Sequence, residues 1–80
     1  MAMRRKTKRL VVRRIMVELA LRREAQGISE RKLCSASGIN RTTYRYANSG
    51  QCVLRLDDFT AVCHALGVNP ARVIERASRT

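Results

Sequence analysis

The stretch Ser29–Gly50, SERKLCSASGINRTTYRYANSG, contains two short helix signals that meet at a single glycine, Gly38. Ser29 can cap the backbone N–H groups of a helix start, and Ile28 and Leu33 have the spacing of a hydrophobic staple. Gly38 suits the left-handed backbone position that follows a last helical turn. The sequence therefore predicts a helix that starts after Ser29 and ends at Gly38.

A second helix is predicted from Asn40 to Asn48. Asn40 is a good cap, and Ile39 and Tyr44 repeat the staple spacing of the preceding helix. Two helices that meet at so short a turn form a helix-turn-helix.

One face of this second helix has no apolar role. Tyr44 and Ala47 lie on the side that Ile39 supports, so this side is expected to face the core. The other side carries two guanidiniums, a hydroxyl and a phenol, from Arg41, Thr42, Arg45 and Tyr46. Such groups can hydrogen-bond base edges and phosphates in a DNA major groove. A solvated polar face is the simpler alternative, and the rest of the chain decides between the two.

In this arrangement the chain resembles the Cro and phage-repressor class of helix-turn-helix proteins, the lambda-repressor-like family. The resemblance covers roughly Leu19 to Glu75. It is carried by Gly27-Ile28-Ser29, Leu33-Cys34, Gly38 through Tyr44, Ser49-Gly50, Phe59, and Ala65 through Val68. No single residue of this set is diagnostic, but the combined spacing is fairly specific. The family implies an all-α, five-helix DNA-binding domain.

The resemblance also implies a division of labour among the polar residues. Contacts to bases are expected from Arg41, Thr42, Arg45 and Tyr46, with Arg41 or Arg45 on a guanine as the strongest expectation. Contacts to flanking phosphates are expected from Asn40 and Thr43. Further backbone contacts are expected from Arg31, Lys32 and Arg55, although each of these suits an ordinary surface charge equally well.

Two positions depart from the family pattern. Glu30 stands where the family usually has a glutamine that donates to a phosphate, and a carboxylate there repels phosphate. Asn48 stands where the family usually has a glutamate paired with the arginine that matches Arg23. The resemblance therefore implies an Arg23–Asn48 hydrogen bond in place of a salt bridge, and a less firmly held recognition helix.

Composition and charge are consistent with this interpretation. The 80 residues suffice for one small domain, whose modest core would benefit from dimerisation. The net charge of +11, from 17 Lys and Arg against 6 Asp and Glu, implies a polyanionic partner. A membrane surface is the competing polyanion, but no apolar run approaches the ~20 residues of a membrane span. The arginines are also not confined to one amphipathic helix.

Residues 1–9, MAMRRKTKR, are predicted to be a disordered basic arm. The arm lacks the apolar core and cleavage site of a secretory signal. It is expected to follow the DNA backbone or enter a minor groove, with a solvated tail as the alternative. Its basic residues are Arg4, Arg5, Lys6, Lys8 and Arg9.

Residues 10–80 are predicted to be one domain that begins with a helix over Leu10–Gln26. Its apolar residues at helical spacing are Val12, Ile15, Met16 and Leu19. A second apolar set, Leu10, Val17 and Leu21, lies away from the first. Either the last helix or a second subunit is expected to cover it.

After a loop between Gly50 and Leu56, two more helices complete the all-α prediction. Leu56–Leu66 carries two aspartates in its first turn and ends before Gly67. The last helix starts at Asn69 and Pro70. Its residues that correspond to the dimer contact of many relatives are Val73, Ile74 and Ala77.

Neither catalysis nor a metal or other cofactor is predicted. Cys34, Cys52, Cys63 and His64 lack the spacing of a zinc site. Cys34 and Cys63 are expected to be buried thiols, Cys52 the only reactive one, and His64 a surface residue. The chain also has no glycine-rich phosphate loop and no clustered acidic pair.

These observations predict a cytoplasmic, nucleoid-associated homodimer that regulates transcription, a phage- or prophage-like repressor. It would read double-stranded operator DNA with two half-sites about one helical turn apart. An antitoxin or restriction-modification controller of the same fold is the alternative within this class. A basic adaptor that binds an acidic protein is a weaker alternative from another class. RNA binding is disfavoured because no aromatic platform accompanies the basic residues.

Overall fold

The computed structural model describes the backbone of residues 5–79 and the side chains of residues 8–79. Its helices are α1 (Arg5–Ala25), α2 (Glu30–Ser37), α3 (Arg41–Asn48), α4 (Leu56–Leu66) and α5 (Pro70–Ser78). No strand is present in this part of the chain, and the all-α prediction is confirmed.

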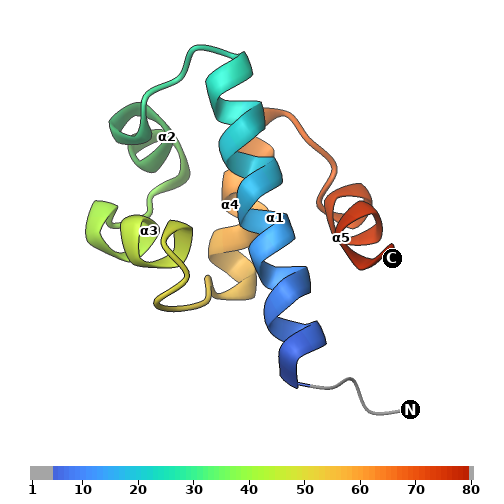
Figure 1. Ribbon diagram of the computed structural model, residues 1–80. Helices are drawn as coiled ribbons and strands as arrows, with labels where there is room; N and C mark the ends of the chain where they lie inside the picture. Colours follow the sequence, from blue (N-terminus) through green and yellow to red (C-terminus); the bar gives the residue numbers. More distant parts are fainter. Residues whose placement is uncertain (1–4, 80) are drawn as a thin grey trace.

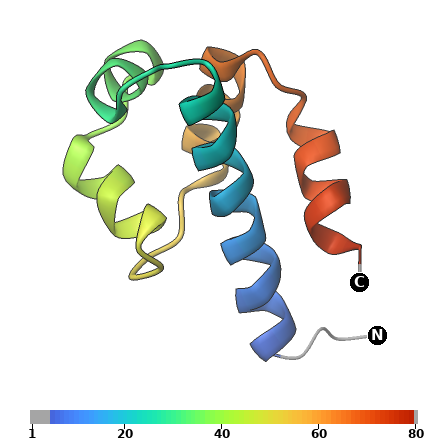
Figure 2. The same ribbon diagram turned by 45° about the horizontal axis from the view of Figure 1, so that its top comes forward.

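The helices are arranged around α1, which runs through the middle of the molecule (Figure 1). α2 and α3 lie on one flank of α1, and α5 lies on the other flank. The turned view in Figure 2 keeps this arrangement. α2 packs against α4, while α5 packs against α1. The helix pair α2–α3 is therefore presented on one side of the molecule.

The core gathers apolar side chains from all five helices. It includes the helix faces that the apolar periodicity predicts on α1 and α4. Its buried members are Met16, Leu19, Leu33, Cys34, Ile39, Tyr44, Ala47, Phe59, Val62, Cys63, Leu66 and Val73.

The helix ends follow the capping residues expected from the sequence. The Ser29 hydroxyl accepts a hydrogen bond of 3.1 Å from a backbone N–H in the first turn of α2. The side chains of Asn40 and Asn69 do the same for α3 and α5, over 2.8 and 2.9 Å. Gly38 and Gly67 end α2 and α4 in the left-handed conformation, with φ of 74° and 70°. Local capping chemistry therefore sets these boundaries.

The first helix starts earlier than the sequence predicts. α1 begins at Arg5 and not at Leu10, so residues 5–9 of the predicted arm belong to the helix in this structure. Arginine and lysine are good helix formers, and neither glycine nor proline interrupts this segment. A helix that nucleates on the apolar residues from Leu10 onward extends through them, because each added residue then costs little. Residues 1–4 lie outside the described part of the chain.

The second apolar stripe of α1 is left uncovered. Leu10, Val17 and Leu21 are 47%, 52% and 60% exposed. Of the two expected covers, the last helix does not cover this stripe, because α5 lies against another side of α1. Val73 is buried in the core instead.

Two polar side chains, Arg14 of α1 and Gln26 just after α1, bind the ends of the neighbouring helices. Arg14 donates to the carbonyl oxygens of Ala77 and Arg79, over 3.4 and 2.9 Å, at the end of α5. Gln26 donates to the Leu66 carbonyl oxygen over 2.7 Å at the end of α4. Such donors satisfy helix carbonyls that have no partner within the helix. The end of α5 is thus bound to α1, and the end of α4 to the residue that follows α1.

An ion pair adds a further tie between α1 and α5. The Arg76 guanidinium donates to both carboxylate oxygens of Glu18. This hydrogen bonding holds the pKa of Glu18 below its usual range, although partial desolvation opposes the effect.

The Glu18 ion pair predicts a pH-dependent contribution to stability. Because the folded-state pKa of Glu18 lies below the ordinary value of 4.5, the pair stabilises the fold above that pH. The contribution is lost as the pH falls through the folded-state pKa. Glu18→Gln is therefore expected to lower Tm at neutral pH, with a difference from wild type that shrinks on acidification. Thermal denaturation from about pH 7 to about pH 3 measures this, and Glu24→Gln is the charge-matched control. A difference that stays constant across this range would contradict the assignment.

Candidate nucleic-acid interface

Helix α3 separates its buried and exposed sides as the sequence predicts. Tyr44 and Ala47 are only 1% and 2% exposed and anchor the helix in the core. The four residues expected to contact bases are all exposed: Arg41, Thr42, Arg45 and Tyr46. α3 itself contains two arginines and no acidic residue. A cationic, hydrogen-bonding face is thus held on a rigid element.

The expected phosphate-contacting residues lie around this face. Asn40 is exposed, and its side-chain oxygen caps α3. Thr43 is exposed on α3, and Arg31 and Lys32 are exposed on the first half of α2. Arg55, just before α4, is exposed and lies 3.4 Å from the Asp57 carboxylate. α2 and α3 share one flank (Figure 1), so most of this set is gathered there.

Glu30 has a partner on α3 that the sequence does not predict. Its carboxylate lies 3.8 Å from Arg45 Nε, with the Arg45 side chain 69% exposed. A pair this open to water contributes little to stability. It does compete with any external anion for the Arg45 guanidinium. Glu30 thus lies close to one of the candidate base-contacting residues.

The expected hydrogen bond between Arg23 and Asn48 is not formed. The Arg23 guanidinium instead donates to the Ile28 carbonyl oxygen over 2.8 Å and lies beside the Tyr44 hydroxyl. Arg23 Nε and the Tyr44 hydroxyl are both buried, and neither atom makes a hydrogen bond of acceptable geometry. Burial raises the pKa of the Tyr44 phenol, and the neighbouring guanidinium partly offsets this. Tyr44, and not Asn48, is therefore the α3 residue beside the Arg23 guanidinium.

The turn after α3 is held by its own backbone. The Tyr46 carbonyl oxygen accepts from the backbone N–H groups of Gln51 and Cys52, over 2.8 and 3.4 Å. Gly50 has a φ of 86°, and a Cβ there would lie 3.3 Å from an Arg13 guanidinium nitrogen. A side chain at this position would be strained and crowded. The chain therefore turns back sharply toward α1 at the end of α3.

No protein-family model matches this chain, and no curated protein has a significantly similar sequence. Among the described helices, none combines the length and the apolar character needed to cross a bilayer.

The arm residues fall into three groups. Arg4 lies outside the described residues, as do the side chains of Arg5 and Lys6. Lys8 and Arg9 are exposed on the N-terminal part of α1. This end of α1 projects beyond the other helices in both views (Figure 1, Figure 2). The basic segment is therefore a helical extension over the part that is described.

The predicted dimer contact on α5 needs correction. Val73 is fully buried and Ala77 is 4% exposed, because they form the side of α5 that packs into the subunit. Ile74 is 41% exposed and is the member of the predicted set that a partner could reach. The spacing of the apolar residues on α5 cannot by itself show whether they face the same subunit or another.

The three cysteines lie as expected. Cys34 and Cys63 are buried, and Cys52 is exposed. Burial raises the pKa of the Cys34 thiol and raises that of Cys63 to about 11. Both are thus protonated at neutral pH and poorly suited to attack a substrate or bind a metal. Within residues 5–79, no three His, Cys, Asp or Glu side chains are grouped to hold a metal ion.

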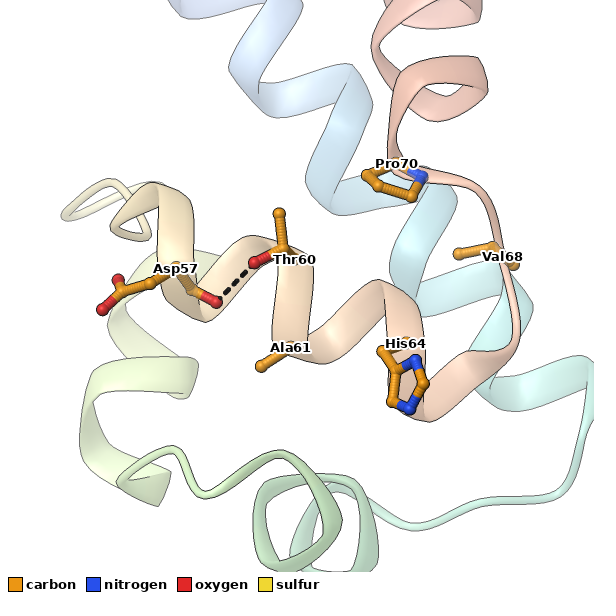
Figure 3. A pocket seen from close by; sticks show the side chains of 6 residues that line it. All are labelled: Asp57, Thr60, Ala61, His64, Val68 and Pro70. Atoms are coloured by element: carbon orange, nitrogen blue, oxygen red, sulfur yellow. Dashed lines mark hydrogen bonds between the residues drawn. The ribbon is translucent and has the colours of Figure 1, made fainter.

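A shallow hollow of about 480 Å³ lies beside His64, on the outer side of α4 and the start of α5 (Figure 3). The Thr60 hydroxyl donates to the Asp57 backbone carbonyl over 2.8 Å, an internal helix contact. In Figure 3 the Asp57 carboxylate points away from His64. The three polar residues therefore do not form a hydrogen-bonded chain of the kind that activates a nucleophile.

Proposed function

We propose that this protein is a sequence-specific, double-stranded DNA-binding transcriptional regulator that inserts α3 into the major groove. The observation that carries the proposal is the division of α3 into a side anchored by Tyr44 and a solvent-exposed face with Arg41 and Arg45. An α-helix fits the width of the B-DNA major groove, where each base pair presents a distinct pattern of donors and acceptors.

The chemistry of the exposed face matches that pattern. A guanidinium from Arg41 or Arg45 can donate two parallel hydrogen bonds to the O6 and N7 atoms of a guanine. Thr42 and Tyr46 offer hydroxyl groups that donate or accept. Arginine and lysine side chains on α2 and before α4 would contact phosphates and set the position of α3. These contacts together would give both affinity and sequence preference.

Selection from a pool of random-sequence duplexes tests this proposal. The wild-type protein is expected to enrich a defined motif that contains guanines, and the motif then serves as the operator in later measurements. DNA footprinting upstream of the protein's own gene gives an independent operator sequence. Failure to enrich any motif would contradict sequence-specific recognition.

A salt titration separates DNA binding from binding of an acidic protein. Neutralising several phosphates releases counterions, so log K is expected to fall steeply and linearly with log of the salt concentration. An electrophoretic mobility assay on the selected duplex gives this slope. If duplex DNA binds weakly with a shallow slope, the basic face serves a protein adaptor instead.

Removal of Glu30 is expected to strengthen DNA binding. Glu30→Ala deletes a carboxylate that repels phosphate and that lies 3.8 Å from Arg45. We expect affinity for the selected duplex to rise by about two- to tenfold at low salt. The matched control is Glu75→Ala, which removes the same charge from an Arg79 ion pair on α5. An equal gain in both variants would mean that only net charge matters and that Glu30 does not act on α3.

We further propose that the protein binds its operator as a homodimer, because one short recognition helix gives limited specific affinity. Ile74 on α5 is the expected contact. Ile74→Glu would place two charges in a two-fold interface, and sedimentation at micromolar concentration is then expected to show a monomer. If this variant stays dimeric while Leu10→Glu becomes monomeric, the contact lies on α1.

A further inference from the structure

A groove of about 730 Å³ separates α1 from the segment that follows α3. α1 contributes lining residues from Lys8 to Leu21, a length of about 20 Å along the helix axis. The opposite wall is formed by Ala47 to Val53, at the end of α3 and in the turn after it. The α1 side of the groove is therefore about as long as a helix of three to four turns.

The lining is apolar along the middle and cationic at one end. Val17, Leu21 and Val53 are exposed by 52%, 60% and 68%. Three basic residues, Lys8, Arg9 and Arg13, line the part formed by the N-terminal half of α1, and no acidic residue lines the groove. Exposed apolar side chains gathered in a concave site mark a place where another molecule binds. The apolar floor offers nothing to a phosphate backbone.

A second copy of this chain lacks the complementary charge. Asp58 is half-buried, and it is the one acidic residue of the six that makes no ion pair in the described structure. The other five already pair with arginines of the same chain: Glu18 with Arg76, Glu24 with Arg23, Glu30 with Arg45, Asp57 with Arg55, and Glu75 with Arg79. With a net charge of +11 and five of its six acidic residues already paired, a second copy is poorly matched to the cationic end of the groove, and an acidic partner protein suits it better.

We propose that this groove binds an acidic amphipathic helix of a partner protein. The apolar side of the helix would pack on Val17, Leu21 and Val53, and its carboxylates would pair with Lys8 and Arg9. This is the helix-in-groove mode of recognition, with apolar anchors at helical spacing. The occupant would also contact Asn48 at the end of α3, so, if α3 reads DNA as proposed above, it would regulate that reading.

A designed peptide tests the groove without any DNA. The probe is a fluorescent 14-residue helix with leucines along one side and glutamates on the other. It is expected to bind the full-length protein saturably, and to shift the NMR methyl signals of Val17, Leu21 and Val53. Leu21→Ser combined with Val53→Ser is expected to weaken binding about tenfold or more, because both anchors lose most of their apolar surface. Lys8→Ala combined with Arg9→Ala is expected to weaken it several-fold and to flatten its salt dependence.

Controls are available on the same chain and in the peptide. Leu56→Ser shortens a residue that is 73% exposed outside the groove, and is expected to leave peptide affinity unchanged. A peptide with lysine in place of glutamate is expected not to bind. Circular dichroism checks that each variant keeps its helices.

Four results would overturn the proposal. In the first two, the acidic peptide does not bind saturably, or the lysine peptide binds equally well. In the third, the protein self-associates and the groove variants abolish this self-association. In the fourth, a random DNA duplex, and not the peptide, shifts the methyl signals of the groove. Because no part of the binding assay contains operator DNA, failure here is distinguishable from failure of α3 to read DNA.

Discussion

Replacing Arg41 and Arg45 together by alanine is expected to reduce binding to the selected operator by about 2–6 kcal/mol, from about 1–3 kcal/mol for each arginine. Both side chains are exposed on α3, opposite the residues that anchor it. Their removal takes away the groups best suited to guanine while the core stays intact. Binding to random duplex DNA is expected to fall much less, because it depends on total charge rather than on base contacts.

The measurement is the Kd for operator and for random duplex at one fixed salt concentration. A double variant with the same loss of charge, Arg22→Ala with Arg72→Ala, is the control, since these two arginines are exposed on α1 and α5. The account predicts loss of specificity in the α3 variant alone. Equal losses of affinity in both double variants would mean that α3 acts only as part of a general basic surface and does not read bases.

Tyr44→Ala is expected to destabilise the fold by about 3–5 kcal/mol, because it empties a fully enclosed aromatic site where α3 meets the core. A loss of this size approaches the whole net stability of so small a domain. Tyr44→Phe is expected to be neutral or slightly stabilising, because the Tyr44 hydroxyl is buried without a hydrogen-bond partner. Urea denaturation followed by circular dichroism measures both variants. A large loss in Tyr44→Phe would show that the hydroxyl makes a stabilising contact, with Arg23 as its neighbour.

Features decided by local chemistry could be predicted from the sequence. Ser29, Asn40 and Asn69 each present an oxygen to backbone N–H groups a few residues ahead, so the starts of three helices depend on short-range geometry. The glycines that end α2 and α4 act equally locally. The apolar spacing on α3 likewise predicted which side is buried, and hence which residues are exposed.

Features decided by long-range packing could not be predicted. The spacing of Val73 and Ala77 indicates an apolar side of α5, but the position of α5 beside α1 decides that this side faces its own subunit. The Arg23–Asn48 contact was implied by the resemblance and is not formed, because the fold places the Arg23 guanidinium against the Ile28 carbonyl and beside Tyr44. The groove could not be predicted either. One wall is α1, the other includes Val53 in a loop without periodicity, and no sequence pattern shows that the two lie side by side.

Methylation interference on the selected operator tests the central claim most directly. Dimethyl sulfate places a methyl group on guanine N7 in the major groove and on adenine N3 in the minor groove. If α3 reads bases through Arg41 or Arg45, methylation of guanine N7 within the site is expected to block binding. Methylation of adenine N3 in neighbouring base pairs of the site is expected to have little effect. Binding that tolerates N7 methylation throughout the operator, or that is blocked only by N3 methylation, would contradict insertion of α3 into the major groove.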